Sequence, residues 1–309
     1  MTKMLVGLGD TKEGRTDTIE VIDLESASTT CSVLPNFPLA LKGPMGGLAF
    51  QDKPMICGGD FGYLKFSKKC FSFEGNEWIP SPSMNRARIY AAVVPSPYPS
   101  KSQKLFVTGG NDEYLNDLNT TEVLTEQGWK TLPQSFPVTN YYHCSVLVNS
   151  TTVWIIGGMQ NNEISSNTFY FNAKTGIWTE GPPMKTKRSS PSCGQIRKSN
   201  QSQELSILVA GGFYGSQLSS VEILDLGSNE WRKGPDLPYG IGLSQMVEDQ
   251  NGGVVLVGGS SDSVDYLDTL FHLPHGGADA EWIRMEQKLK LGRYYHVAFL
   301  VPDNNVDCS

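Results

Sequence analysis

The sequence predicts an all-β protein assembled from six similar units of about 50 residues. Three observations support this prediction: short apolar runs that end in a Gly-Gly pair, tryptophans that follow these pairs at a nearly constant distance, and the lack of any apolar pattern with a helical period. A length of 309 residues alone would suggest two domains. A repeat of this period instead predicts one continuous domain over residues 1–309.

Five glycine pairs set the period of the repeat. They follow the runs MIC, LFVT, VWII, ILVA and VVLV, and their second glycines are spaced 51, 48, 54 and 47 residues apart. The pairs are Gly58 and Gly59, Gly109 and Gly110, Gly157 and Gly158, Gly211 and Gly212, and Gly258 and Gly259. A degenerate sixth copy, MLVGLGD, opens the chain. Because glycine allows a left-handed backbone and the close approach of another segment, we interpret these positions as structural.

Five tryptophans keep the same register. They are Trp78, Trp129, Trp178, Trp231 and Trp282, and they follow the second glycines by 19, 19, 20, 19 and 23 residues. A buried indole covers roughly 200 Å² while its N–H still reaches a partner. We therefore interpret these tryptophans as packing residues on the outer strand of each unit.

Each unit is predicted to contain four strands separated by turn residues. Four-stranded sheets repeated around an axis form a β-propeller, and burial of both sheet faces explains apolar runs that do not alternate with polar residues. The predicted blades span residues 45–80, 88–132, 141–180, 188–233 and 241–286, with a first blade made of residues 3–35 and 293–301. The last segment, LGRYYHVAFLVP, is expected to supply the strand that the N-terminal unit lacks.

The Gly-Gly pairs, the later tryptophan and the period together resemble kelch repeats over essentially the whole chain. This resemblance implies a six-bladed propeller that acts as a scaffold for protein–protein interaction, on the loop face around its central channel. Kelch proteins also include a sugar mutarotase, copper- or iron-dependent enzymes and actin-associated structural proteins. An enzyme and a structural protein therefore remain alternatives to the scaffold.

The loops after the second strands and the links between blades are expected to share one face of the propeller. Arginine and tyrosine are the usual anchors of binding surfaces, and arginines favour an acidic peptide or another anionic ligand. The candidate binding residues are Arg15, Tyr63, Arg86, Arg88, Asn111, Tyr114, Tyr141, His143, Arg188, Tyr214, Tyr239, Arg293, Tyr294 and His296. Alanine at Arg88 and Arg293 is then expected to weaken partner binding without lowering the melting temperature.

Catalytic and metal motifs are lacking, so neither a catalytic residue nor a cofactor is predicted. The two Tyr-Tyr-His segments that begin at Tyr141 and Tyr294 could in principle supply copper ligands, but they belong to opposite blades and are interpreted as packing residues. On a strand, Asp268 and His272 would lie on the same face, whereas Asp265 would lie on the other face. This spacing departs from the iron-binding kelch proteins of plants, and no metal site is predicted.

Charge and cysteine content limit the classes of partner and the cellular compartment that the sequence predicts. A net charge of −7 without a Lys/Arg block argues against nucleic acid, and no apolar run is long enough to insert into a membrane. The expected state is a cytoplasmic monomer with buried thiols. A Cys57–Cys70 disulfide is geometrically possible. If a signal peptide has been removed, the protein would instead be extracellular. Sequons at Asn119, Asn149 and Asn200 occur about as often as chance predicts.

Overall fold

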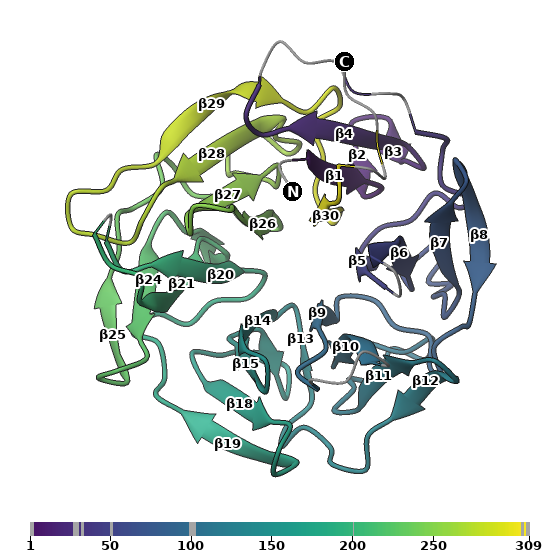
Figure 1. Ribbon diagram of the computed structural model, residues 1–309, viewed down its shortest axis with the longest axis horizontal. Helices are drawn as coiled ribbons and strands as arrows, with labels where there is room; N and C mark the ends of the chain where they lie inside the picture. The colour runs from purple at the N-terminus through teal and green to yellow at the C-terminus, as the bar shows by residue number, and fades with distance from the viewer. Residues whose placement is uncertain are drawn as a thin grey trace.

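The computed structural model describes residues 3–26, 31, 34–49, 52–98, 103–199, 201–303 and 306. This part of the chain forms strands, turns and loops without an α-helix, and its sheets are arranged around a ring (Figure 1). The prediction of an all-β propeller is therefore confirmed. No helix that could cross a membrane is found among the described residues.

Five blades are four-stranded antiparallel sheets in which the strands follow chain order from the axis outward. Blade 2 contains β5 (Met45–Leu48), β6 (Pro54–Cys57), β7 (Cys70–Glu74) and β8 (Glu77–Ser81). Blade 3 contains β9 (Ala92–Pro95), β10 (Gln103–Thr108), β11 (Thr121–Thr125) and β12 (Gly128–Thr131). Blade 4 contains β14 (Cys144–Asn149), β15 (Thr152–Ile156), β18 (Thr168–Asn172) and β19 (Ile177–Gly181). Blade 5 contains β20 (Ser192–Arg197), β21 (Leu205–Ala210), β24 (Val221–Asp225) and β25 (Glu230–Lys233), and blade 6 contains β26 (Gln245–Glu248), β27 (Val254–Val257), β28 (Thr269–Leu273) and β29 (Ile283–Lys288).

Blade 1 combines the two ends of the chain. Its strand β1 (Lys3–Gly7) lies between β4 (Ile19–Asp23) and β30 (Val297–Val301), and every residue of β1 pairs with β30. The inner strands contact one another in the order β30, β5, β9, β14, β20, β26 and back to β30. The remaining strands are two-residue pieces of loops: β2 (Asp10–Thr11), β3 (Gly14–Arg15), β13 (Asn140–Tyr141), β16 (Met159–Gln160), β17 (Glu163–Ile164), β22 (Phe213–Tyr214) and β23 (Ser216–Gln217).

The repeated glycines shape the loops of each blade, and the repeated tryptophans hold most blades to the link that precedes them. All ten glycines of the pairs have positive φ, between 57° and 102°. The indole N–H groups of Trp78, Trp129, Trp231 and Trp282 donate to proline carbonyl oxygens at 2.8–3.1 Å. The proline-rich links therefore serve as acceptors for the outer tryptophans, and among the five repeat tryptophans only Trp178 has a buried N–H without such a partner.

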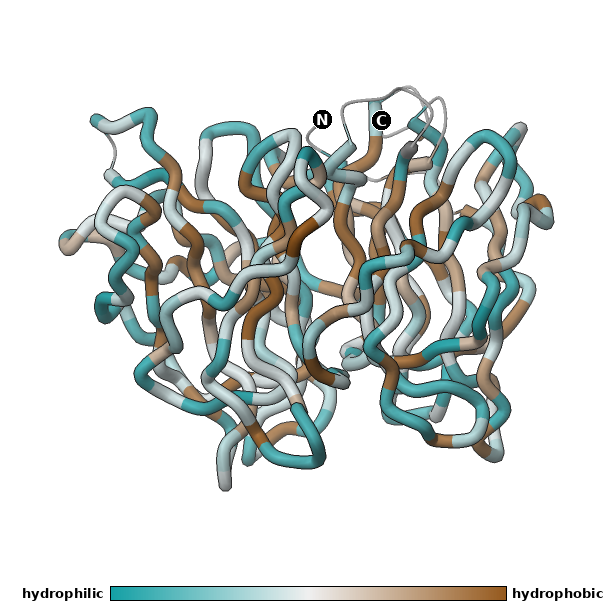
Figure 2. Tube along the Cα trace, turned by 90° about the horizontal axis from the view of Figure 1, so that it is seen from below, coloured by the Kyte–Doolittle hydropathy of each residue, from teal (hydrophilic) through white to brown (hydrophobic). Residues whose placement is uncertain are grey.

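The propeller has two distinct faces. We call the face formed by residues 8–18, 58–69, 109–120, 157–167, 211–220 and 258–268, together with the links between blades, the loop face. Backbone bonds join these loops to the next link, as in Gly59 N–H to Arg88 O at 3.0 Å and Gly259 N–H to Arg293 O at 2.9 Å. The start of β1 and the end of β30 lie at the opposite end, which is the upper edge of Figure 2; we call this the termini face.

Disulfides replace the predicted buried thiols. Cys57 and Cys70 face each other on β6 and β7 and form one bond. Cys144 and Cys193 join the inner strands of blades 4 and 5. Cys31 is also disulfide-bonded, and no cysteine of the described residues is free. Cys308 lies outside the described residues. The expectation of buried thiols is therefore wrong, because the strand register brings these side chains within bonding reach.

Candidate functional site

Three of the predicted ligand anchors are buried inside the blades. The side chains of Arg88, Arg188 and Arg293 are 0%, 0% and 1% exposed and pair with Glu122, Glu222 and Glu20 at 2.7, 2.9 and 2.9 Å. A ligand on the surface cannot reach them. The structure therefore contradicts a binding mouth built from these three arginines, although their links do lie on the loop face.

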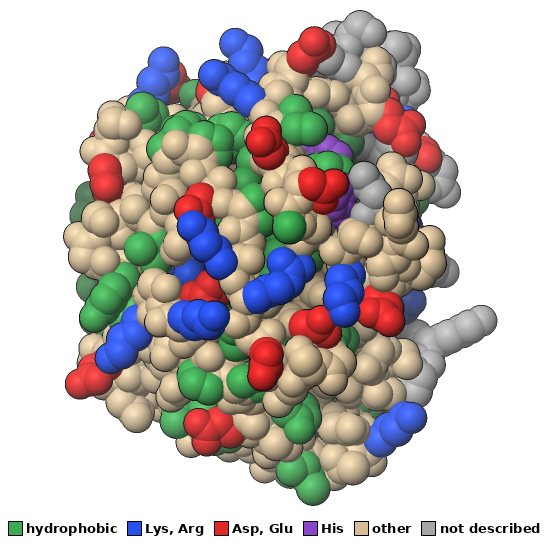
Figure 3. Space-filling model, turned by 90° about the vertical axis from the view of Figure 1, so that its left-hand side faces the viewer, with side chains coloured by type: hydrophobic (Ala, Val, Ile, Leu, Met, Phe, Trp, Pro, Cys, Tyr) green, Lys and Arg blue, Asp and Glu red, His purple; other side chains and the backbone are tan. Residues whose placement is uncertain are grey.

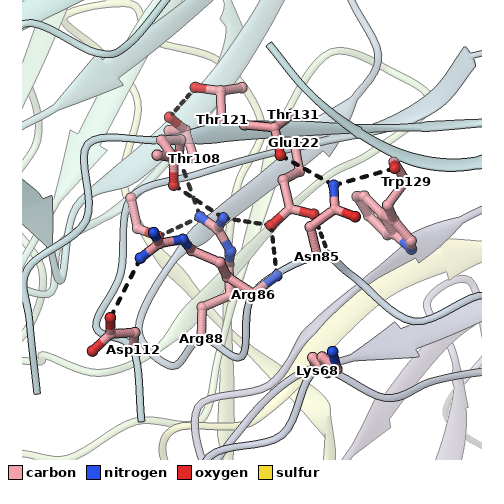
Figure 4. Close-up of polar contacts among 12 residues, drawn as sticks. Lys68, Asn85, Arg86, Arg88, Thr108, Asp112, Thr121, Glu122, Trp129 and Thr131 are labelled. Carbon is pink, nitrogen blue, oxygen red and sulfur yellow. Dashed lines mark hydrogen bonds and ion pairs between the residues drawn. The ribbon is translucent and has the colours of Figure 1, made fainter. Parts of the chain in front are cut away.

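Arg88 shows what these residues do instead (Figure 4). Its guanidinium donates to the carbonyl oxygens of Gly109 at 2.8 Å and Thr120 at 3.2 Å, and to the Glu122 carboxylate. The same carboxylate accepts the backbone N–H of Asn85 at 2.6 Å. The pair thus fastens the link before blade 3 to the second and third strands of that blade.

The arrangement recurs in blades 1 and 5. Arg188 donates to Gly211 O and Ser220 O, and Arg293 to Leu8 O and Thr18 O, at 2.8–3.3 Å. We call these three ion pairs the arginine clamps. The sequence carries a signal for them that our prediction missed: Glu20, Glu122 and Glu222 each follow a threonine or serine by two residues, in TIE, TTE and SVE.

Burial determines the electrostatics of the clamps. It lowers the pKa of Arg88, and the negative charge of Glu122 opposes that effect. Breaking a buried pair by removing one partner leaves an uncompensated charge and typically costs about 3–5 kcal/mol. Burial of the clamps therefore predicts that alanine at Arg88 and Arg293 lowers the melting temperature, opposite to the expectation from the sequence.

His143 and His296 are buried as well, which contradicts their assignment to a ligand site. They are 7% and 1% exposed, and burial lowers the pKa of each to about 3. Both ring nitrogens of each histidine are buried without a hydrogen-bond partner. The His143 ring packs so closely on Gly109 that a Cβ there would lie 2.7 Å from Cε1. Both histidines are packing residues that remain neutral.

Three tyrosines close the axis at the loop face, and none of them was among the predicted site residues. Tyr90, Tyr142 and Tyr295 precede the inner strands of blades 3, 4 and 1, and all have left-handed φ values of 53–59°. The rings of Tyr90 and Tyr142 are 4.2 Å apart, and the Tyr142 and Tyr295 hydroxyls are 3.0 Å apart. Because blades 1 and 4 are opposite each other, this contact spans the axis. We call these residues the tyrosine collar.

A cavity of about 670 Å³ lies inside the ring and is lined by all six inner strands. The collar residues line a separate, smaller pocket of about 90 Å³. In the larger cavity the Glu248 carboxylate accepts the Gln195 backbone N–H at 2.7 Å. Glu248 is open to this cavity, and desolvation by the surrounding strands raises its pKa. The channel therefore holds an acidic group that the sequence prediction did not single out.

Exposed apolar side chains gather on the loop face. Of the thirteen large hydrophobic residues that are exposed in the described chain, nine lie there. They are Phe61, Tyr63 and Leu64 in blade 2, Tyr114 and Leu115 in blade 3, Phe213 and Tyr214 in blade 5, Tyr239 in the link to blade 6, and Val264 in blade 6. The other four, Ile79, Ile177, Leu205 and Ile283, lie on β8, β19, β21 and β29. The loop face is thus the apolar face of the molecule.

Two of these groups are equivalent. Tyr63–Leu64 and Tyr114–Leu115 occupy matching positions at the tips of neighbouring loops, and we call them the tyrosine–leucine pairs. The tyrosines are 98% and 78% exposed and the leucines 59% and 56%. Both leucines have left-handed backbones, with φ of 58° and 61°. Such a conformation is uncommon for a large side chain and needs support from the surrounding loop.

The remaining predicted residues take several roles. Arg15 is exposed and pairs with Asp60 at 2.8 Å, and Arg86 is exposed and lies 3.5 Å from Asp112. Asn111 is buried and donates to a carboxylate in its own loop. Tyr214 and Tyr239 are exposed, and the half-buried residues Tyr141 and Tyr294 lie beside the collar, where their rings contact Tyr142 and Tyr295.

The comparisons with known proteins agree with this architecture. Solved structures with this type of fold are numerous, with 434 matching chains. One of them, the structure of YjhT, has a TM-score of 0.75 and 12% sequence identity, and the match covers 92% of this chain and 95% of that one. Residues 140–185 and 205–238 match the kelch motif. No curated protein sequence matches the chain.

The class of protein is therefore a β-propeller. The two segments that match the kelch motif lie in blades 4 and 5, so the chain carries kelch motifs in two of its six blades.

Proposed function

We propose that this kelch propeller is a monomeric binding scaffold that holds a protein partner on its loop face. The observation that carries the proposal is the pair of exposed tyrosine–leucine tips on neighbouring blades. Tyrosine is enriched among the residues that dominate binding energy, and contiguous exposed apolar side chains mark interaction sites. Tyr63 and Tyr114 are accordingly the proposed central contacts.

The loops that present these tips are held in one conformation. Asp112 Oδ1 accepts the backbone N–H groups of Tyr114 and Asn116 at 3.0 and 2.9 Å. Asp60 supports its loop in the same way, through the N–H of Gly62 at 2.8 Å. Because these loops are ordered before binding, association costs less conformational entropy than it would for mobile loops.

The charges of the loop face support an apolar rather than an acidic partner surface. The three clamp arginines are buried, and Arg15 and Arg86 are each paired with an aspartate of the face itself. The flank formed by blades 5 and 6 shows Lys and Arg side chains interspersed with Asp and Glu (Figure 3). We therefore propose a protein partner that contributes its own apolar side chains, and no nucleic acid.

Affinity capture with matched variants tests the proposal. The purified protein, the loop variant Tyr63→Ser with Tyr114→Ser, and the control variant Ile177→Ser with Ile283→Ser are each immobilised and exposed to an extract of the source tissue. The control removes two exposed apolar side chains of 59% and 55% exposure from outer strands. We expect to find proteins that bind the unchanged protein and the control variant but do not bind the loop variant. Equal capture by all three would contradict the proposal.

A second candidate, a small-molecule site like that of a sugar mutarotase, is favoured by the cavity inside the ring. Its volume of about 670 Å³ lies within the range of ligand pockets, roughly 300–1,000 Å³. Glu248 is the side chain that would act on or bind a ligand there. Loss of sugar binding in Glu248→Gln, with unchanged capture of the protein partner, would establish this second function.

We also propose that the protein works in an oxidising compartment rather than in the cytoplasm. Disulfides persist outside the cytosol and are rare within it, and this chain has one bond within a blade and one between blades. Mapping of disulfides in protein from the natural source, alkylated during lysis, tests this: free thiols at Cys57 and Cys144 would contradict it.

A further inference from the structure

We propose that Asn149 is an N-glycosylation site. This inference goes beyond the proposed binding function, although it shares the oxidising compartment. Three sequons are present, and the structure distinguishes two of them, since Asn200 lies outside the described residues. Asn149 stands at the turn between β14 and β15, whereas Asn119 stands in the loop that leads into β11.

The Asn149 sequon has its acceptor group available. Asn149 and Ser150 are exposed. The Asn149 Oδ1 accepts the Thr151 backbone N–H at 2.9 Å and the Thr151 hydroxyl at 3.0 Å. The carboxamide oxygen is therefore fixed on the sequon threonine, and Nδ2 donates no hydrogen bond within the part of the chain that is described. Nδ2 is the atom that receives the sugar.

The Asn119 sequon serves the fold instead. Thr120 accepts two bonds from Arg88, through its carbonyl oxygen at 3.2 Å and its hydroxyl at 3.3 Å. Thr121 is 0% exposed and its hydroxyl bonds with that of Thr108 at 2.7 Å. The Asn119 carbonyl accepts the Phe136 N–H at 2.7 Å. An arginine clamp and two strands thus hold Thr120 and Thr121 of this sequon, and Asn119 itself is half-buried whereas Asn149 is exposed.

The reaction needs a donor that the secretory pathway supplies. An oligosaccharide linked to a polyisoprenyl pyrophosphate is the co-reactant, and the host transferase brings it to the sequon. The anomeric C–O bond to pyrophosphate breaks, a C–N bond to Asn149 Nδ2 forms, and one amide proton is lost as the lipid pyrophosphate leaves. No oxidation or reduction takes place. The compartment that forms the disulfides is also the one in which this transfer occurs.

The position of Asn149 is compatible with the proposed binding site. The turn lies at the end of inner strand β14 that is remote from the collar, because Tyr142 and His143 precede the other end of that strand. A glycan there would cover the termini face near the channel and leave the loop face free. Glycosylation and partner binding are thus expected to be independent, so either proposal can fail without the other.

Peptide mapping of the protein from its natural source tests the site. The digest is treated with peptide N-glycosidase in heavy-oxygen water, which converts a glycosylated asparagine to labelled aspartate. Labelled aspartate at position 149 and an unlabelled peptide containing Asn119 are expected. An unmodified Asn149 peptide as the main species would overturn the proposal, and so would a glycan at Asn119 with Asn149 unmodified.

A matched pair of variants gives a second readout. Asn149→Asp keeps the oxygen that accepts both Thr151 bonds but cannot carry a glycan, and Asn119→Asp is its control. Both are expressed through a eukaryotic secretory pathway, and intact mass is measured with and without glycosidase. Loss of one glycan in Asn149→Asp alone supports the site. An unchanged glycan number in that variant contradicts it.

Discussion

The arginine clamps and the tyrosine–leucine pairs belong to the same loop face, yet they have opposite environments. The clamp arginines are 0–1% exposed and reach inward to carboxylates of their own blades. The tip tyrosines are 78% and 98% exposed. The clamps recur in alternate blades, 1, 3 and 5, whereas the tips occur only in blades 2 and 3. Residues that recur around the ring therefore hold the propeller together, and residues that break its symmetry are the better candidates for function.

The largest expected effect comes from opening a clamp. Arg88→Ala removes the partner of buried Glu122 and leaves two carbonyl oxygens without their donor. We expect the free energy of unfolding to fall by about 3–5 kcal/mol, measured by urea denaturation. Arg88→Met combined with Glu122→Leu should recover part of this loss, because no charge is left buried alone. Unchanged stability in Arg88→Ala would mean that the clamps are dispensable.

A smaller effect per residue is expected from pH. His143 and His296 have ordinary pKa values in the unfolded chain but values of about 3 in the folded protein, because both are fully buried. Between about pH 6.5 and pH 3 only the unfolded chain takes up these protons, so stability falls as the pH is lowered. At pH 5 the loss is about 2 kcal/mol for each histidine.

Urea unfolding from pH 8 to pH 5 measures this dependence. The doubly substituted protein, His143→Leu with His296→Leu, should show a flatter pH profile whatever its absolute stability. An equally steep profile in the double variant would show that other groups cause the loss.

The smallest effect on stability is expected at the tips. Leu64→Gly and Leu115→Gly remove apolar side chains from residues with φ of 58° and 61°. Glycine relieves the left-handed strain but adds entropy to the unfolded chain, so the free energy of unfolding should change by less than about 1 kcal/mol. Partner binding should nevertheless be lost, because the exposed leucines are part of the proposed contact. A large loss of stability would show that the tips belong to the fold.

The sequence predicted the features that depend on local chemistry repeated in most of the blades. A glycine pair with positive φ and a tryptophan whose N–H meets a proline carbonyl leave marks at fixed spacing. Both features could therefore be predicted from the sequence.

The direction of a side chain was not predictable in this way. Arg293 lies on a loop-face link as expected, but its orientation depends on Glu20, which is 273 residues away. The tyrosine collar depends on left-handed backbone at three link residues, and the Cys144–Cys193 bond depends on the register of two separate blades. These features require the assembled ring.

Photo-crosslinking tests the central claim most directly. A benzophenone amino acid is placed at position 63, on the loop face, or at position 177, on the outer strand of blade 4, and each protein is irradiated with the partner obtained by capture. The account predicts that the partner is cross-linked from position 63 and not from position 177. Cross-linking from position 177 alone would show that the partner binds the rim of the blades and would contradict the assignment of the loop face.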